Sequence, residues 1–379
     1  MTALERTSLH LKWILGMKLR LPVSLLAALA LPASAIAQVA PAPARLPDAA
    51  LVKAIAGKLA EMGENYSGVV MVARKGKLVA TFAQGWADRE RKIPNTADTK
   101  FRVGSMDKTF TAVAVMQLAQ AGKLDVQASL ITYLKDYPNA DWARKVTLHH
   151  LLTHQGGAGE IFTPEYEARR DRVRTLQDYV DLFGKRAPDF EPGSKDDYSN
   201  YGFILLGRVI EAVSGQSYYD YVRAHIFQPA GMTGSGFEPE TMPVPGRAVA
   251  YEHEKADFTL AGGLPWRGTS AGGGYATAED FVKFAMALYD GRLLDETHRK
   301  QMTTGFVDLG DGMKYGYGIA IYPSPLPIVG HNGGAPGMAG DLRIIDGGEG
   351  VIVALSNVAP PFLAGRLSKF VSDRFQVAP

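Results

Sequence analysis

The chain has 379 residues, of which 46% are hydrophobic and 21% charged, and its formal net charge is +2. This composition is ordinary for a globular protein with a large core, and it lacks the clustered basic excess of a nucleic-acid-binding protein. There is no cysteine, which excludes disulfides, thiolate metal sites and thiol catalysis. The eight histidines are scattered, so we predict no metal site and no cofactor.

The first 37 residues have the pattern of a cleaved signal peptide. A short basic stretch at 17–20 precedes an apolar run over 21–31, and residues 35–37 form a small-x-small cleavage pattern. Pro22 and Pro32 interrupt the stretch over 21–37, which is shorter than the ~20 residues that span a bilayer. We therefore predict a signal peptide over 1–37, with Met17 as an alternative start, no membrane span after cleavage, and a periplasmic or secreted protein.

Helix and strand signals begin after a linker at 38–50 that is rich in Ala and Pro. Apolar spacing predicts a helix over 51–62. Two β-rich runs at 67–73 and 77–83 flank a polar turn at 74–76, which is the signal of a β-hairpin.

The middle of the chain is predicted to be helical, with long loops. A helix over 109–121 is apolar nearly all round and should be buried, with Gly122 as its C-terminal cap. Two further helices are predicted over 201–213 and 278–288, the second with Thr277 as its N-cap.

The last part of the chain changes to short β-rich runs between Gly-rich turns. Strands are predicted over 316–322, 327–330, 342–345 and 351–357, before a closing amphipathic helix over 362–375. Strands at both ends with helices between them predict a sheet assembled from the two termini, with a helical region inserted. We therefore predict one domain over 51–379, with an α/β part at 51–104 and 305–379 and a helical part at 105–304.

Ser105 and Lys108 form the first reactive pair. They lie three residues apart at the start of a helix, so their side chains share one face. The helix N-terminus would favour negative charge near Ser105, and burial would lower the pKa of Lys108 until it can accept a proton. The alternative is that Ser105 caps the helix and Lys108 reaches solvent.

The second motif is Tyr198-Ser199-Asn200, and its spacing also occurs at Tyr137-Pro138-Asn139. We prefer Tyr198 because a helix follows it directly. A tyrosine acts as a base only where a cation holds its phenolate, which Lys108 would do, and Asn200 would orient the lysine or a substrate amide. The alternative is a packed tyrosine whose hydroxyl caps a turn.

The third motif is His331-Asn332-Gly333, and His154-Gln155-Gly156 resembles it. We prefer His331 because it follows a predicted strand, whereas His154 lies in a loop without a β-rich run. Gly333 and Gly334 leave room for a ligand, and the backbone N–H groups of Gly334 and Ser105 would form an oxyanion hole. The alternative is that the glycines only turn the chain.

The order and context of these motifs resemble the serine β-lactamase/penicillin-binding superfamily. The resemblance is to its class C-like branch, with D-alanyl-D-alanine carboxypeptidases and class C-like esterases. It covers nearly all of 51–379, and the segments that carry it are 101–105, 151–157, 198–202 and 272–280. It implies an α/β fold of the β-lactamase/transpeptidase type, in which helices flank an antiparallel sheet and an all-helical subdomain is inserted.

The resemblance also implies roles for the motif residues. Ser105 would be the acylated nucleophile, Lys108 its proton-managing partner and Tyr198 the general base. Four residues would bind or position the substrate: Asn200, His331, Gly333 and Gly334.

The third motif departs from the β-lactamases of this branch, which usually have Lys-Thr-Gly or Lys-Ser-Gly. Histidine is mostly neutral at pH 7, and Asn332 lacks the hydroxyl that would bind a substrate carboxylate. We therefore expect an exported serine hydrolase that acts on a small ester or amide, a D-amino-acid or peptidoglycan-derived peptide, or a β-lactam. The alternatives are a penicillin- or muropeptide-binding protein without turnover and a weak class C-like β-lactamase.

Overall fold

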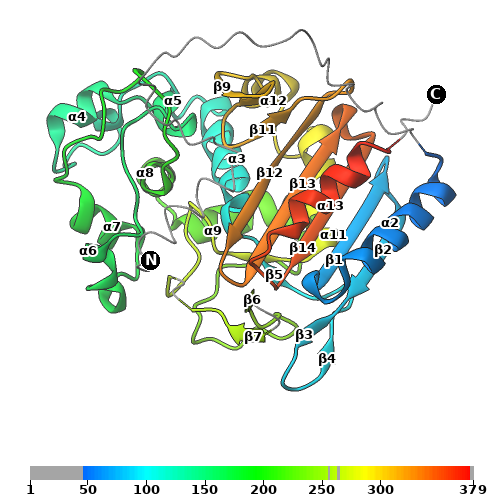
Figure 1. Ribbon diagram of the computed structural model, residues 1–379. Helices are drawn as coiled ribbons and strands as arrows, with labels where there is room; N and C mark the ends of the chain where they lie inside the picture. Colours follow the sequence, from blue (N-terminus) through cyan, green and yellow to red (C-terminus); the bar gives the residue numbers. More distant parts are fainter. Residues whose placement is uncertain (1–45, 255–256, 263–264, 376–379) are drawn as a thin grey trace, which may run out of the picture.

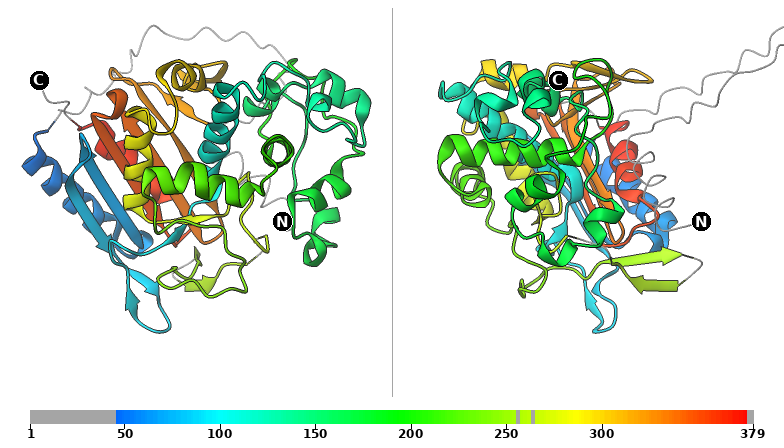
Figure 2. Two further views of the ribbon diagram at one scale, coloured as in Figure 1. Left: turned by 180° about the vertical axis from the view of Figure 1, so that it is seen from behind. Right: turned by 90° about the vertical axis from the view of Figure 1, so that its left-hand side faces the viewer.

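The computed structural model describes residues 46–254, 257–262 and 265–375 (Figures 1 and 2). The predicted signal peptide and most of the predicted linker lie outside these residues. Among the described residues, no helix has the length and apolar character needed to cross a bilayer.

The centre of the molecule is an eight-stranded antiparallel sheet in the order β2-β1-β14-β13-β12-β11-β10-β9 (Figure 1). Its strands, in chain order, are β1 (Gly68–Arg74), β2 (Lys77–Gln84), β9 (Val307–Gly310), β10 (Met313–Tyr315), β11 (Ala320–Tyr322), β12 (Ile328–Ala335), β13 (Met338–Ile345) and β14 (Gly350–Ser356). Strand β1 from the start of the chain pairs with β14 from its end along their whole length. The predicted assembly of the sheet from both termini is therefore confirmed.

Helices cover both faces of the sheet. On one face, α2 (Asp48–Met62) and α13 (Leu363–Ser372) lie side by side and bury apolar residues against alternate residues of β1, such as Val70 and Val72 (Figure 1). On the other face, Val69 and Met71 join the larger core with α3 (Asp107–Gln120) and α11 (Ala278–Tyr289) (Figure 2). This alternation follows from the period of two in a strand.

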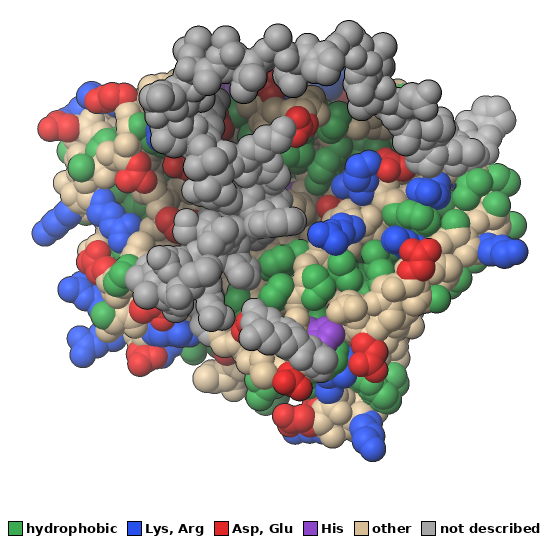
Figure 3. Space-filling model, viewed as in Figure 1, with side chains coloured by type: hydrophobic (Ala, Val, Ile, Leu, Met, Phe, Trp, Pro, Cys, Tyr) green, Lys and Arg blue, Asp and Glu red, His purple; other side chains and the backbone are tan. Residues whose placement is uncertain are grey.

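A mainly helical region adjoins the sheet on the α3 side (Figures 1 and 2). Its further helices are α4 (Ala140–Lys145), α5 (Leu148–Leu152), α6 (Pro164–Glu167), α7 (Leu176–Phe183), α8 (Asn200–Ser214), α9 (Tyr218–Val222), α10 (Gln228–Ala230) and α12 (Glu296–Met302). Short two-stranded sheets pair β3 (Trp86–Asp88) with β4 (Ile93–Pro94), β5 (Phe101–Arg102) with β8 (Tyr275–Ala276), and β6 (Tyr251–Glu254) with β7 (Asp257–Leu260). Basic and acidic side chains are mixed over the face that Figure 3 shows.

Local signals in the sequence correspond to observed turns and caps. Lys75 and Gly76 both have positive φ in the β1–β2 hairpin, as a tight two-residue turn requires. Thr277 accepts a hydrogen bond from the backbone N–H of Asp280 at the start of α11. Gly122 follows α3 with φ +66°, and its N–H and that of Lys123 donate to carbonyls of the last turn, which is a Schellman motif.

Three predicted strands differ in extent from the observed ones, and the one predicted over 342–345 begins at Met338 as β13. The strand predicted from residue 316 begins at Ala320, because Gly318 turns the chain with φ +59° and a Cβ there would lie 2.6 Å from the Lys108 carbonyl oxygen. The strand predicted to end at 330 continues as β12 through Ala335. Pairing with β13 satisfies its backbone and outweighs the low strand propensity of Asn and Gly.

Candidate active site

Ser105 lies in a one-turn 3-10 helix, η2 (Gly104–Met106), directly before α3, and its side chain is partly exposed. This turn packs closely on strand β12. A Cβ on Gly104 would lie 2.8 Å from the Gly334 nitrogen, and a Cβ on Gly333 would lie 2.0 Å from the Val103 carbonyl oxygen. Glycine at both positions therefore allows the nucleophile turn to reach the strand.

The structure brings the predicted reactive residues together. The Tyr198 hydroxyl donates to Ser105 Oγ at 2.6 Å, and Lys108 Nζ lies 3.3 Å from the same oxygen. Lys108 is fully buried, and its Nζ also donates to Asn200 Oδ1 at 2.7 Å and to the Ala271 carbonyl at 2.5 Å. The alternative of a solvent-exposed Lys108 is therefore wrong.

The protonation states follow from burial. Burial lowers the pKa of Lys108 to about 7, although the negative charges of Glu160 and Asp107 act in the opposite direction. Burial raises the pKa of Tyr198 far above its ordinary value. Lys108, and not a Tyr198 phenolate, is thus the group that can accept a proton near neutral pH in this structure.

The neutral form of Lys108 fits its surroundings. A neutral amine has two N–H groups and one lone pair, and the two shortest contacts of Nζ are to the acceptors Asn200 Oδ1 and Ala271 O. The lone pair is then left for the third contact, to Ser105 Oγ. The geometry therefore directs the basic electron pair at the nucleophile.

Glu160 is a site residue that the sequence analysis missed. Asn200 Nδ2 donates to both of its carboxylate oxygens, at 3.0 Å to Oε1 and 2.8 Å to Oε2. Its Oε1 also accepts from the backbone N–H of Ile161 at 2.5 Å. Burial raises the pKa of Glu160, while these hydrogen bonds and the charge of Lys108 lower it. The only signal in the sequence was a carboxylate after the Gly-rich segment 156–159. Asn200 thus lies between Lys108 and Glu160.

The third motif is arranged differently from the sequence prediction, in which His331 binds or positions the substrate. His331 is only 1% exposed, with Nε2 at 2.9 Å from the Tyr315 hydroxyl and Nδ1 at 2.5 Å from the Asn332 carbonyl oxygen. Burial, together with the nearby charge of Lys108, lowers the pKa of His331 to about 3, so the ring is neutral. Its side chain lies among buried residues behind the strand edge.

Gly334 is oriented for the role that the sequence suggested. A two-residue turn joins β12 to β13, so its flanking residues Ala335 and Met338 form the hydrogen-bonded pair. The alternation of an antiparallel ladder then leaves the pair of Gly334 and Ala339 without mutual hydrogen bonds. The Gly334 N–H therefore points away from β13, and its nitrogen lies close to the turn that carries Ser105.

The two similar motifs that we set aside behave differently from each other. Tyr137 is buried away from the nucleophile, and its hydroxyl lies 3.1 Å from that of Tyr201. His154 packs directly on the catalytic tyrosine candidate, with 4.3 Å between the ring centroids of His154 and Tyr198. His154, which we did not prefer as the third motif, thus contributes to the surroundings of the site.

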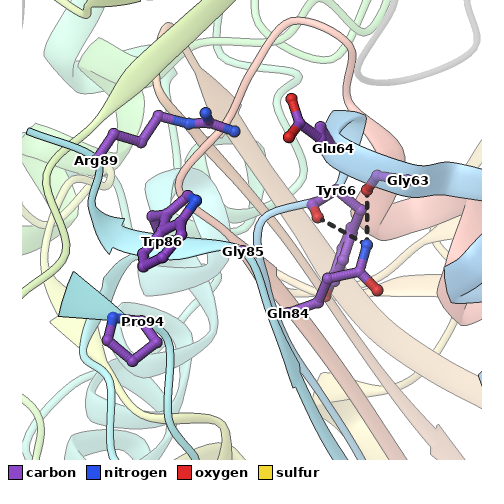
Figure 4. A pocket seen from close by; sticks show the side chains of 8 residues that line it. All are labelled: Gly63, Glu64, Tyr66, Gln84, Gly85, Trp86, Arg89 and Pro94. Atoms are coloured by element: carbon purple, nitrogen blue, oxygen red, sulfur yellow. Dashed lines mark hydrogen bonds between the residues drawn. The ribbon is translucent and has the colours of Figure 1, made fainter. Parts of the chain in front are cut away.

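A separate pocket of about 290 Å³ lies near the ends of α2 and β2 (Figure 4). It is lined by Gly63, Glu64, Tyr66, Gln84, Gly85, Trp86, Arg89 and Pro94. These residues include no candidate nucleophile with a base beside it. No group of three His, Asp or Glu that could hold a metal ion occurs in the described part of the chain.

The fold is that of the penicillin-binding protein and other solved structures that the chain resembles. The Beta-lactamase family model matches residues 52–370, and the chain belongs to this family.

Similar proteins in the family have several named activities. Esterase EstB of Burkholderia gladioli is 29% identical over an alignment of 359 residues. The match covers 80% of this chain and 89% of the esterase. A penicillin-binding protein from Bacillus halodurans superimposes with a TM-score of 0.71 at 31% identity, covering 86% of this chain and 98% of the other. D-amino acid amidase from Ochrobactrum anthropi SV3 gives a TM-score of 0.72 at 25% identity, covering 86% and 96%.

Proposed function

We propose that the protein is a serine hydrolase that cleaves a small ester or amide through an acyl-enzyme at Ser105. The observation that carries this proposal is the contact of Ser105 Oγ with both the buried amine of Lys108 and the hydroxyl of Tyr198. A nucleophile activated by an adjacent base is the requirement for covalent catalysis by serine.

The reaction would proceed in two halves. Ser105 Oγ attacks the substrate carbonyl carbon and transfers its proton to Lys108 Nζ, while the N–H groups of Ser105 and Gly334 donate to the developing oxyanion. As the C–O or C–N bond breaks, the proton passes to the leaving alcohol or amine, and Tyr198 holds Oγ in place. Water then attacks the acyl carbon, gives a proton to the same base and releases the acid, and Ser105 recovers its proton.

The charge of the site favours substrates without a carboxylate beside the reacting bond. His331 is neutral and buried, and Lys108 is surrounded by acceptors of the protein itself. Neither basic side chain of the three motifs is therefore available to bind a substrate carboxylate. This supports an ester or a neutral amide over a β-lactam or a peptide with a free C-terminus.

The test replaces Ser105 by Ala in the full chain, with Ser324→Ala, a change in an exposed loop, as the matched control. Substrates are p-nitrophenyl butyrate, D-phenylalaninamide and nitrocefin. Loss of the nucleophile should lower kcat/KM by ~10³-fold or more, and the control should keep the wild-type rate. Wild-type turnover of any of these substrates by Ser105→Ala would refute the assignment.

A second candidate function is a penicillin-binding protein that is acylated and stays acylated, which the likeness to the Bacillus halodurans protein supports. Mass spectrometry after addition of benzylpenicillin separates the two. A persistent adduct on Ser105, without turnover of any ester or amide, supports this second function. Rapid return of the unmodified mass supports hydrolysis.

We further propose that the protein is exported after cleavage behind residue 37, because the first 37 residues have the pattern of a signal peptide. N-terminal sequencing of the protein from the extracytoplasmic fraction should start at Gln38. A chain that keeps residues 1–37 in the cytoplasm would contradict this proposal.

A further inference from the structure

Three buried side chains form a continuous hydrogen-bonded chain, one end of which packs against Tyr198. His154 follows α5, Tyr315 ends β10 and His331 lies in β12, and they are 6%, 2% and 1% exposed. His154 Nε2 lies 3.2 Å from the Tyr315 hydroxyl, which lies 2.9 Å from His331 Nε2. The two histidines therefore share one phenol.

Backbone groups at both ends fix the direction of the hydrogen bonds. The Ser199 N–H can only donate, so His154 Nδ1, at 3.2 Å, accepts. His154 Nε2 then carries the proton and donates to Tyr315, whose hydroxyl donates to His331 Nε2. The proton of His331 is therefore on Nδ1, which donates to the Asn332 carbonyl oxygen.

Both histidines must be neutral for this arrangement. In a charged ring both nitrogens carry a proton, so the ring would lose the nitrogen that accepts a hydrogen bond. Burial lowers the pKa of His154 well below its ordinary range, and it lowers that of His331 to about 3. The positive charge of Lys108 acts in the same direction on both rings. The chain thus has one consistent distribution of protons.

The two ends of this hydrogen-bonded chain contact two different parts of the site. At one end, His154 binds the N–H of Ser199 and packs against the ring of its neighbour Tyr198. At the other end, His331 binds the carbonyl of Asn332, two residues before the N–H of Gly334. The hydrogen-bonded chain therefore connects Tyr198, which holds Ser105 Oγ, with the strand edge that would hold the oxyanion.

We propose that His154 and Tyr315 are positioning residues, which together with His331 hold Tyr198 and the β12 edge at a fixed separation around Ser105. The consequence for catalysis rests on the proposed hydrolase function, but the proton arrangement itself does not. Positioning errors of about 1 Å can cost about 10²-fold in rate, so the hydroxyl of one buried tyrosine can be important without contacting substrate.

The first test needs no activity. NMR spectra of the full chain labelled with ¹⁵N-histidine report the tautomer of each ring at pH 7, and His154→Gln and His331→Gln assign the two signals. We expect a neutral ring protonated at Nε2 for His154 and a neutral ring protonated at Nδ1 for His331. A charged ring, or the opposite tautomer at either position, would overturn the inference while leaving the hydrolase proposal intact.

The second test compares two buried tyrosines that lie two residues apart in the sequence. Tyr315→Phe should lower kcat by roughly 10- to 100-fold and leave KM within about twofold, because it removes the hydroxyl that joins the two histidines but no substrate contact. Tyr317→Phe is the matched control. Tyr317 is equally buried, and its hydroxyl lies 2.9 Å from His149 Nδ1, which is not part of this hydrogen-bonded chain. The control should keep the wild-type kcat.

Equal kcat values for Tyr315→Phe and Tyr317→Phe would overturn the positioning role. If Tyr315→Phe does not fold, His331→Gln and His331→Leu carry the same comparison. Glutamine places an amide oxygen near the position of Nε2 and should keep at least tenfold more of the kcat than leucine does. Equal kcat values in these two variants would again overturn the role.

Discussion

At the scale of single residues, the proposed chemistry depends on the fully buried amine of Lys108. Burying an ammonium group costs free energy, and this cost shifts the equilibrium towards the neutral amine. Two charged neighbours, Glu160 and Asp107, offset part of the shift, so the pKa of Lys108 lies at about 7 and not lower. Part of the amine is therefore in the neutral, basic form at neutral pH.

The pH dependence of hydrolysis should report this amine. Below pH 7 the amine is mostly protonated and cannot accept the Ser105 proton, so kcat/KM on a neutral ester should rise with pH and level off above a midpoint near 7. Lys108→Arg should lower kcat/KM by ~10²–10⁴-fold at every pH, because a guanidinium stays protonated. A rate that is flat or falls between pH 5 and 9 would exclude Lys108 as the base.

Replacement of Glu160 by Gln tests the origin of that midpoint. The carboxylate raises the pKa of Lys108, and the amide keeps an oxygen that can accept from Asn200. The midpoint of the kcat/KM profile of Glu160→Gln should therefore move to lower pH. The exposed change Glu165→Gln, in α6, should leave it in place. A midpoint that moves to higher pH would contradict the electrostatic role of Glu160.

The sequence predicts the local part of this site and misses the rest for a physical reason. Ser105 and Lys108 are one helical turn apart, so their approach follows from the helix alone. Glu160, His154 and Tyr315 reach the site only through the packing of loops and strands that are far apart in the chain. His154 has a motif of the right kind, but its loop position says nothing about the tyrosine it contacts.

At the scale of elements, the packing of the Ser105 turn on strand β12 fixes the position of the nucleophile. Glycine occupies both sides of this contact, at Gly104 and Gly333, and backbone atoms fill the space where side chains would otherwise be. Backbone atoms cannot move aside as the end of a flexible side chain can. The contact therefore tolerates no Cβ on the strand.

Gly333→Ala should impair both folding and activity. Its Cβ would lie 2.0 Å from the Val103 carbonyl oxygen and 2.8 Å from the Ser105 nitrogen, so the turn must shift away from β12. We expect a loss of ~1–3 kcal/mol in the free energy of unfolding, measured by urea denaturation, and a lower kcat.

Gly57→Ala in α2 is the matched control for this substitution. A Cβ there has no atom within 4 Å, so the change should stabilise the helix by about 0.5–1 kcal/mol. A fully stable and active Gly333→Ala variant would contradict the close approach.

Elements marked by local chemistry were predictable, whereas the extent of β12 was not. The hairpin turn at Lys75 and Gly76 and the cap at Thr277 depend on residues within a few positions. The His-Asn-Gly-Gly run has the composition of a turn, and only its partner β13 makes it a strand. The sequence therefore predicted that the motif follows a strand, whereas it lies inside β12.

At the scale of the whole molecule, the sheet and the helical region share one hydrophobic core. The larger cluster of buried residues includes Val69 and Val353 of the central strands together with Leu151 of α5 and Tyr201 of α8. Helix α3 lies between the two regions and contributes buried residues along its whole length (Figure 1). Because this core is continuous, separating the two regions would expose apolar residues of both to water. Neither region would then be stable on its own.

We therefore expect the two regions to unfold in one cooperative transition. Trp142 of α4 is buried in the helical region, whereas Trp86 of β3 lies beside the sheet. Variants of the chain without residues 1–37 that keep only one of these tryptophans, the others being replaced by Phe, report on each region by fluorescence. Each fluorescence midpoint should coincide with the far-UV circular dichroism midpoint of the same variant.

The comparison within each variant removes the effect of the Trp→Phe changes on overall stability. If the Trp142 signal changes at a lower temperature than the circular dichroism signal, the helical region unfolds first and the core is not shared energetically. Coincident midpoints would mean that Tyr198 and Asn200, from the helical region, and His331, from the sheet, are lost together. The site would then exist only in the fully folded molecule, because its parts come from both regions.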